Sequence, residues 1–383
     1  MLVRFWGVRG STPTPQSENL RYGGNTSCVE VRVNGHIYVF DCGTGFRNLS
    51  KQLAQEHAEN GKSGHPINAH IFLSHFHWDH IQGIPFFSPL YNDRDNSFVF
   101  HSSSRTRGLQ QALEEQMADP YFPVNMSEMA ARRQFVNIDE GRTTLDHCTV
   151  QSMWLNHPQG CMGYRLETKE GVVVYATDNE PGDPKLDEEL RELAAGADIF
   201  INDAQYTPEQ LATTRKGWGH SSWREGVKVA REAGAKTLVL FHHDPDATDK
   251  MVDGLLREAR DEFDSVFAAS EGMVITLGSS DGKLEAHMPV TRTALRREAQ
   301  FRAKVSGITE GGHPFQEETV VRDLALQGAL ISLSNAPRLQ SELQVTMETP
   351  GAEGPKVMKL RGYVVRIDTS DEGQSAVGVV FTE

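Results

Sequence analysis

Four residues of the kinds that bind metal ions stand within six positions of this chain. The segment 75–80 reads HFHWDH and follows directly on the apolar residues 71–73. Imidazole and carboxylate groups are the ligands that zinc and similar divalent ions take in proteins. A strand that ends in such a segment delivers its ligands to the edge of a sheet, where a pocket can form. The candidate ligands are His75, His77, Asp79 and His80.

Further residues of these kinds come directly after short apolar runs. Because the apolar runs read as buried strands, the residues that follow them belong to loops at sheet edges. Repeated placement of ligand-type side chains at strand ends is what a shared pocket requires. These residues are Asp41, His157, Asp178, Asp203, His242 and His243.

The elements that would position these residues alternate between strands and helices through residues 1–289. Asn34 and Gly35 suit a two-residue hairpin turn. Because hairpins accompany the alternation, the pattern predicts a mixed α/β domain rather than a simple parallel, doubly wound sheet. Strands are expected at 1–7, 28–33, 36–41, 69–73, 150–155, 162–167, 172–176, 198–202, 236–241 and 273–277, and helices at 46–59, 106–117, 186–195, 223–233 and 249–263.

The order of the candidate ligands resembles that of the metallo-β-lactamase fold. An HxHxDH segment at 75–80 is followed by a lone His157, a lone Asp178 and a histidine at 242 or 243. The resemblance covers residues 1–289 and is closest to the phosphodiesterase branch, which includes ribonuclease Z and cyclic-nucleotide phosphodiesterases. It implies an α/β fold in which two sheets lie between outer helices, the αββα sandwich.

The resemblance also implies two divalent metal ions, with zinc the first choice and manganese or iron as alternatives. The ligands of one ion would be His75, His77 and His157. The ligands of the other ion would be Asp79, His80 and His242, with His243 as the alternative to His242. Asp178 would bridge the two ions, and Asp41 would orient a ligand from behind.

Two close divalent ions favour phosphodiester hydrolysis, because they lower the pKa of water and neutralise charge on phosphoryl oxygens. Asp79 can accept the proton of the nucleophile. The segment 219–222 resembles the His-Ser-Thr element of ribonuclease Z, whose histidine protonates the leaving oxygen, so His220 is the candidate general acid. Asp203 lies in a segment similar to the family's His-Glu-Ala-Thr-Tyr and would orient and charge His220. The alternative for 220–222 is an ordinary helix cap.

Residues 290–383 contain an arginine-rich segment at 296–302, the segment DLALQG at 323–328 and two apolar runs at 362–366 and 377–381. These features resemble those of a PilZ domain, a small β-barrel that binds cyclic di-GMP. Guanidinium groups bind phosphates bidentately and stack on purines, and glycine lets the backbone come close to a ligand. The residues that this resemblance assigns to cyclic di-GMP are Arg296, Arg297, Arg302, Asp323 and Gly328. The chain departs from the family pattern at Ala325, where serine is usual, and in the four residues that separate Arg297 from Arg302.

The PilZ-like region begins with a segment of helical composition, and a second function for it is possible. Residues 292–304 are basic and helical in composition, and short strands follow them. The alternative to ligand binding is a barrel that serves as a docking module or as the contact of a homodimer.

The composition of the chain limits the kinds of partner and the cellular compartment that we expect. The 383 residues carry a net charge of −14, and of 38 basic and 52 acidic residues only 11 and 12 lie in 290–383. The acidity therefore lies in the first 289 residues, which argues against a nucleic-acid partner. The four cysteines show no CxxC spacing, which fits a reducing cytoplasm. No apolar run is long enough to predict a membrane span.

The substrate prediction rests on one spacing. Ribonuclease Z carries a long insertion between its lone histidine and its bridging aspartate, whereas His157 and Asp178 are only 21 positions apart here. We therefore expect a small phosphodiester, such as cyclic AMP or cyclic GMP, hydrolysed under the control of cyclic di-GMP. The alternatives are a cyclic di-GMP-responsive scaffold of weak activity, an RNA-processing nuclease, and another hydrolase on the same fold such as a thioesterase or lactonase.

Overall fold

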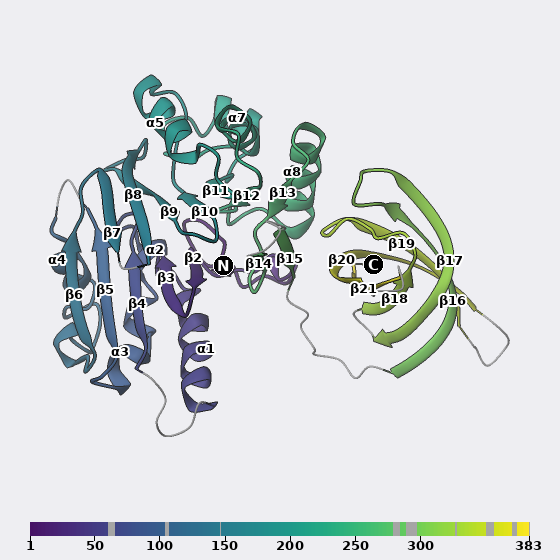
Figure 1. The fold of residues 1–383 in the computed structure, drawn as a ribbon, viewed down its shortest axis with the longest axis horizontal. Helices are drawn as coiled ribbons and strands as arrows, with labels where there is room; N and C mark the ends of the chain where they lie inside the picture. Colours follow the sequence, from purple (N-terminus) through teal and green to yellow (C-terminus); the bar gives the residue numbers. More distant parts are fainter. Residues whose placement is uncertain are drawn as a thin grey trace. The chain divides into compact units, whose positions relative to one another are not determined.

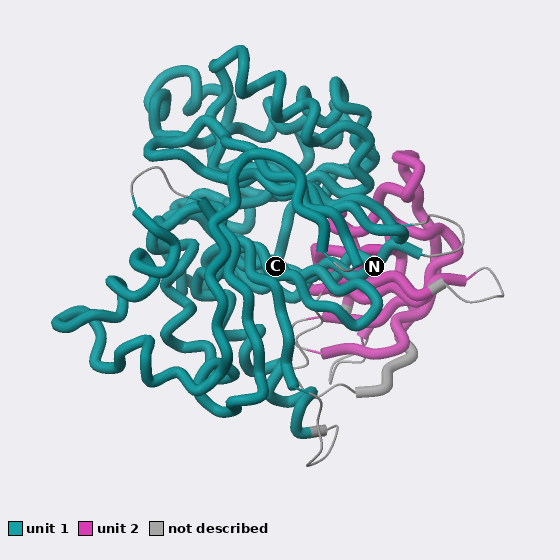
Figure 2. The backbone as a smooth tube through the Cα atoms, turned by 60° about the vertical axis from the view of Figure 1, so that its left-hand side comes forward, with its two compact units in different colours: residues 1–284 teal, residues 285–383 magenta. Residues whose placement is uncertain are grey.

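The computed structural model describes residues 1–59, 66–103, 107–145, 147–278, 284–288, 297–325, 328–349, 356–369 and 374–382. The chain divides into two compact units, residues 1–284 and 285–383 (Figure 2). A domain boundary between residues 289 and 290 stays a prediction, close to this division. Each unit is described separately below.

Unit 1 contains two β-sheets. Within residues 1–284, the strands of the first sheet lie in the order β14-β1-β2-β3-β4-β5-β6 and those of the second in the order β13-β12-β11-β10-β9-β8-β7 (Figure 1). The strands of the first sheet are β1 (Leu2–Gly7), β2 (Cys28–Val33), β3 (His36–Phe40), β4 (Asn68–Phe72), β5 (Ser97–Ser102), β6 (Arg132–Asn137) and β14 (Val274–Leu277). Those of the second are β7 (Gly141–Leu145), β8 (Cys148–Leu155), β9 (Cys161–Glu167), β10 (Val172–Ala176), β11 (Ile199–Asp203), β12 (Leu238–Phe241) and β13 (Val266–Ala268).

Helices cover the outer face of each sheet. The helices are α1 (Phe46–Glu59), α2 (Trp78–Ile81), α3 (Pro89–Asn92), α4 (Leu109–Glu115), α5 (Pro184–Ala194), α6 (Pro208–Thr213), α7 (Trp223–Ala233) and α8 (Asp249–Glu262). Apolar residues of α1, α3 and α4 form one core with β3, β4 and β5, and those of α5, α7 and α8 form another with β10, β11 and β12. Among the described helices, none has the length and apolar character that crossing a membrane requires.

Aromatic side chains fill the space between the two sheets. The ring centroids of Phe40 on β3 and Tyr175 on β10 are 5.4 Å apart, and those of Phe5 on β1 and Phe241 on β12 are 6.1 Å apart. Large buried rings remove much apolar surface from water and lock the two sheets together. The unit is therefore a four-layer α/β/β/α sandwich, as predicted.

Strand direction brings the functional residues to one edge. Strands β3, β4 and β5 run parallel to one another, as do β10, β11 and β12. Strand β8 pairs antiparallel with β9, which pairs antiparallel with β10, so β8 and β10 share a direction. The carboxyl ends of parallel strands lie at the same edge of a sheet, where ligands are usually bound.

The sequence predicted most of these elements but not all. The hairpin of β2 and β3 is confirmed, with Asn34 at φ 49° and Gly35 at φ 83°. Strands β5, β6, β7 and β13 and the short helices α2, α3 and α6 were not predicted. Strands β6 and β7 lack the apolar run or clean alternation that marks a strand in sequence. The predicted helix at 106–117 is shorter, spanning Leu109–Glu115, and residue 106 lies outside the described residues.

Unit 2 is a closed barrel of six strands in the order β16-β17-β18-β21-β20-β19. Its strands are β16 (Arg297–Ile308), β17 (Pro314–Ala325), β18 (Gly328–Leu333), β19 (Glu342–Thr349), β20 (Lys356–Thr369) and β21 (Ser375–Phe381), and a short β15 (Leu284–His287) precedes them. The helical expectation for 292–304 is wrong from residue 297 onward, and residues 292–296 lie outside the described part. Ala303 and Val305 are buried whereas Arg302 and Lys304 are exposed, which is the two-residue period of a strand.

Candidate active site

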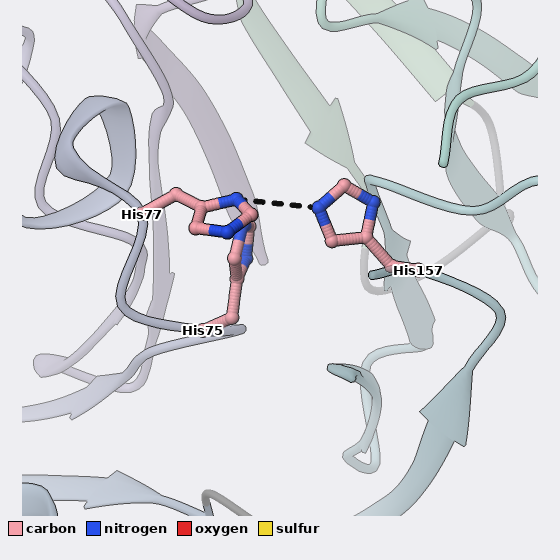
Figure 3. Close-up of side chains that lie close together, drawn as sticks. All are labelled: His75, His77 and His157. Carbon is pink, nitrogen blue, oxygen red and sulfur yellow. Dashed lines mark hydrogen bonds between the residues drawn. The ribbon is translucent and has the colours of Figure 1, made fainter. Parts of the chain in front are cut away.

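Three histidines from two different sheets meet at the shared strand edge. His75 and His77 follow β4, and His157 follows β8; Figure 3 shows the rings turned toward one another. The Nδ1 of His77 lies 3.3 Å from the Nε2 of His157. One ligand atom from each of the three residues lies within 4.8 Å of the others. This spacing suits one divalent ion with imidazole ligands.

A second group lies beside the first and is more deeply buried. Asp79 and His80 belong to α2, and His242 follows β12. The Oδ2 of Asp79 is 3.1 Å from the Nε2 of His80 and 3.3 Å from the Nε2 of His242. The two Nε2 atoms are themselves 3.3 Å apart. These three residues therefore form a second candidate ligand set.

Asp178 stands between the two groups. Its Oδ1 lies 3.8 Å from the Nε2 atoms of both His75 and His157. Its Oδ2 lies 3.4 Å from the Nε2 of His80 and 3.3 Å from that of His242. Each carboxylate oxygen faces one group, which is the arrangement that a bridging ligand needs.

One buried nitrogen atom indicates that these side chains are suited to bind divalent metal ions. The Nε2 of His75 is buried and has no hydrogen-bond partner in the described part of the chain, although its Nδ1 contacts Ser74. A buried polar atom without a partner is costly, and a metal ion would satisfy it. Burial and the neighbouring His80 hold the pKa of His75 well below its usual range, so its imidazole is neutral and able to bind a metal ion.

The carboxylates of the site are held in their charged form. Burial opposes ionisation, but His80 and His242 hold the pKa of Asp79 well below its usual value. The same two histidines lower the pKa of Asp178 against the effect of burial. Both aspartates are therefore ionised, as metal ligands must be.

Three residues of the site adopt a backbone conformation that is unusual for a side chain. Asp41, Asp178 and His242 have φ values of 59°, 54° and 59°. Each follows the end of a strand, where the left-handed turn bends the chain away from the sheet. Such backbone strain persists where contacts with the surrounding structure hold the residue in place, and it is concentrated at functional sites.

Hydrogen bonds from behind orient the candidate ligands. His80 donates from Nδ1 to the Oδ2 of Asp41 at 2.7 Å, which agrees with the role expected of Asp41. His157 donates from Nδ1 to the carbonyl of Gly219 at 2.8 Å, and His242 donates from Nδ1 to the Oε1 of Gln205 at 2.9 Å. These bonds fix the ring orientation, so that the Nε2 of each ring faces the site. Gly219 and Gln205 lie in the two segments that resemble ribonuclease Z, but sequence reasoning gave neither residue a role, because a backbone carbonyl and a lone amide leave no pattern.

A buried histidine–carboxylate pair adjoins the cluster. His220 donates from Nδ1 to the Oδ2 of Asp203 at 2.8 Å, and this Nδ1 is 3.8 Å from the Oδ1 of Asp178. Asp203 also accepts from the backbone N–H of Ser221 at 2.9 Å and from that of Gln205 at 3.0 Å. Burial disfavours the charged imidazole, but Asp203 raises the pKa of His220 to about 9.

The structure distinguishes the two adjacent histidines. His242 lies in the second ligand group, whereas His243 donates from Nε2 to the carbonyl of Ala269 at 2.9 Å. Burial lowers the pKa of His243 to about 3, so it is a neutral packing residue. The ordinary helix cap is also not formed, since Ser222 precedes α7 without a side-chain capping bond.

The residues assigned to cyclic di-GMP are only partly described. Arg296 lies outside the described residues, and for Arg297 only its place in β16 is described. Arg302 is exposed on β16, where it pairs with Val320 of β17. Asp323 lies on β17, and Gly328 opens β18 opposite Ala325. A Cβ atom at Gly328 would lie 2.4 Å from the carbonyl oxygen of Val379, so only glycine fits there.

Comparison with known proteins agrees with this geometry. The family description of the β-lactamase superfamily domain matches residues 36–243, and that of the PilZ domain matches residues 291–383. Ribonuclease Z of Haloarcula marismortui is 28% identical over 318 residues, which cover 71% of this chain and 96% of that protein. The chain belongs to the β-lactamase superfamily and carries a PilZ domain after the catalytic fold.

Solved structures show the same fold. Human tRNase Z, short form, superposes with a TM-score of 0.52 at 20% identity, covering 73% of this chain and 100% of that one. A diphosphatase of the PhnP family superposes with a TM-score of 0.54 at 17% identity, covering 72% and 98%. The predicted fold class and the prediction of a metal-dependent hydrolase are confirmed. The prediction against a nucleic-acid partner is not supported, because the relatives include ribonuclease Z.

Proposed function

We propose that the protein is a dinuclear metal-dependent phosphodiesterase of the cytoplasm that acts on a small phosphodiester, such as cyclic AMP or cyclic GMP. We further propose that cyclic di-GMP, bound by the barrel, regulates it. The observation that carries the catalytic part is the His220–Asp203 pair beside Asp178, whose two oxygens face two separate ligand groups. A hydrolase that releases an alkoxide needs such a proton donor next to its metal site.

The metal assignment follows the two groups. One ion would be held by His75, His77 and His157 and the other by Asp79, His80 and His242, with Asp178 shared between them. The bound ions would supply a nucleophilic hydroxide at neutral pH and neutralise charge on the phosphoryl oxygens. Zinc suits this mixture of imidazole and carboxylate ligands, and manganese or iron would also suit it.

The residues of the chain carry out the proton transfers. Asp79 accepts the proton of the attacking water, and the backbone N–H of Ser11 donates to its Oδ2 at 2.8 Å, which fixes the carboxylate. As the new oxygen–phosphorus bond forms, the bond to the leaving oxygen breaks. His220 then gives its proton to that oxygen, and Asp203 stabilises the imidazolium until it does so.

The preference for a small substrate rests on the connection between His157 and Asp178. This connection contains only the hairpin of β9 and β10, both of which are paired within the sheet. An arm that clamps a large RNA has no room in that segment. The second candidate is RNA 3′-end processing, which the 28% identity to a ribonuclease Z favours.

The proposal is tested by hydrolysis of bis-(p-nitrophenyl) phosphate with zinc or manganese. We expect turnover by the wild type and its loss in the His77→Ala and Asp79→Ala variants, whereas His243→Gln keeps it if the variant folds. Absence of hydrolysis with any metal would favour the scaffold alternative.

A panel of substrates, assayed in parallel, decides the substrate class. Cyclic AMP, cyclic GMP, an RNA with a 3′ extension, a lactone and a thioester are compared by kcat/KM. The highest value for a cyclic nucleotide supports the proposal, the highest value for the RNA supports the second candidate, and the highest value for the lactone or thioester would refute phosphodiesterase function.

A further inference from the structure

A tryptophan in the loop before His220 is exposed beside a cation. Trp218 is 54% exposed, and the guanidinium carbon of Arg215 lies 4.5 Å from the centroid of its ring. An indole has a large apolar surface, and leaving it in water forgoes the stabilisation that burial gives. Together with the cation of Arg215, and two residues from His220, this exposed ring offers a flat surface to an aromatic ligand.

The loop that carries Trp218 is held in place. The carboxylate of Glu180 accepts from the backbone N–H of Gly217 at 2.6 Å and from that of Gly219 at 2.7 Å, so it binds both neighbours of Trp218. Gly219 also accepts from His157, and a Cβ atom at Gly219 would lie 2.3 Å from the Nδ1 of His157. The backbone on both sides of Trp218 is thus held in place.

A series of ring contacts leads from Trp218 to the proton donor. The guanidinium of Arg215 lies 5.7 Å from the ring centroid of Tyr206 as well as over Trp218. The ring of Tyr206 lies 5.8 Å from that of His220, edge to face. Trp218 is therefore close to the proton donor, two positions before it in the chain and connected to it through Arg215 and Tyr206.

Resting on the proposed function, we propose that Trp218 and Arg215 form a stacking platform for the nucleobase of a nucleotide phosphodiester. A base has a flat π-face that stacks on indole, and the guanidinium adds attraction to the base and to the phosphate. Diesters without an aromatic base gain nothing from an indole at this position. The platform thus selects nucleotides over glycerol-type diesters, although it does not read which base is present.

The test compares two ligands that differ by a nucleobase. Adenosine 5′-monophosphate and ribose 5-phosphate are titrated into the metal-loaded, full-length protein by calorimetry. We expect the nucleotide to bind about 5- to 150-fold more tightly, the range that a base–aromatic stack produces. This ratio should fall toward one in Trp218→Ala and be largely kept in Trp218→Phe, which retains an aromatic face.

Matched controls separate stacking from general damage. Tyr121→Ala removes another exposed aromatic side chain, in the segment after α4, and should leave the ratio unchanged. Equal affinities of the two ligands for the wild type, no measurable nucleotide binding, or an unchanged ratio in Trp218→Ala would each overturn the platform. Because binding is measured without turnover, a protein that binds the nucleotide preferentially but hydrolyses no diester would refute the proposed function and leave the platform standing.

Discussion

His220 is a buried histidine whose charge depends on one carboxylate. Burial alone would favour the neutral ring, but the 2.8 Å hydrogen bond to Asp203 raises its pKa to about 9. The raised value means that His220 is protonated below this pH and loses its proton as the pH rises through it. A reaction that needs the imidazolium should therefore lose rate on the alkaline side.

The first prediction concerns a variant in which the carboxylate of Asp203 is replaced by an amide. Asp203→Asn should lower the pKa of His220, so the alkaline limb of the kcat profile should move to lower pH. We also expect kcat near pH 8 to fall about 10²- to 10⁴-fold, the usual contribution of a general acid. The measurement is kcat from pH 6 to 10 on a phosphodiester with an alkoxide leaving group. Asp246→Asn, at an exposed aspartate, is the control, and an alkaline limb that stays in place in Asp203→Asn would exclude this role.

A residue of the site could be predicted from the sequence where it is of a metal-binding type and also follows an apolar run. The HFHWDH segment, His157, Asp178 and His242 all satisfy this condition, and the structure brings them together. Gln205 and Gly10 could not be found in this way, because their roles depend on distant contacts. A Cβ atom at Gly10 would lie 2.5 Å from the ring of His242 and 2.8 Å from Gln205, so glycine there makes room for their hydrogen bond.

At the scale of elements, the paired parallel strands explain why scattered residues converge. Buried strands such as β10 and β12 are apolar runs and are readable from sequence. Strand β16 was mistaken for a helix because its exposed positions are rich in arginine and lysine, which are good helix formers. Pairing with β17 and β19 outweighs that local preference, and such pairing is a long-range property.

The second prediction concerns the loop 214–219 as a unit. Glu180→Gln removes the charge that binds the N–H groups of Gly217 and Gly219 and places an amide donor where an acceptor stood. Hydrogen bonds to a charged group contribute about 1.5–3 kcal/mol, so amide hydrogen exchange at these two glycines should accelerate roughly 10- to 100-fold. Exchange is measured by NMR or mass spectrometry.

The control for this loop is Glu188→Gln on α5, where the carboxylate pairs with Arg191 at the surface. It should leave exchange in the loop unchanged. Unchanged exchange in Glu180→Gln would show that the loop holds its conformation without the carboxylate, and the rigid platform described above would lose its support.

At the scale of the whole molecule, the chain joins a hydrolase fold to a small receptor-like barrel. Composition already separates the two, because the excess of acidic residues lies in the first 289 residues. The sequence could not predict the exact strand pairing of the barrel, which depends on closure between β16 and β19. Whether the barrel mediates a homodimer stays a prediction.

The third prediction tests the barrel as a receptor. Cyclic di-GMP should bind the full-length protein, and Arg302→Ala should weaken binding at least about tenfold, since a guanidinium–phosphate contact is a charge-assisted, bidentate one. Calorimetry measures the affinity, and turnover is followed with and without saturating ligand. Lys304→Ala is the matched control, because Lys304 is also exposed on β16 but belongs to no predicted ligand contact. Equal binding heats for the wild type and Arg302→Ala would show that Arg302 does not contact the ligand. Binding without any change in turnover would show that the barrel is a receptor that does not control hydrolysis.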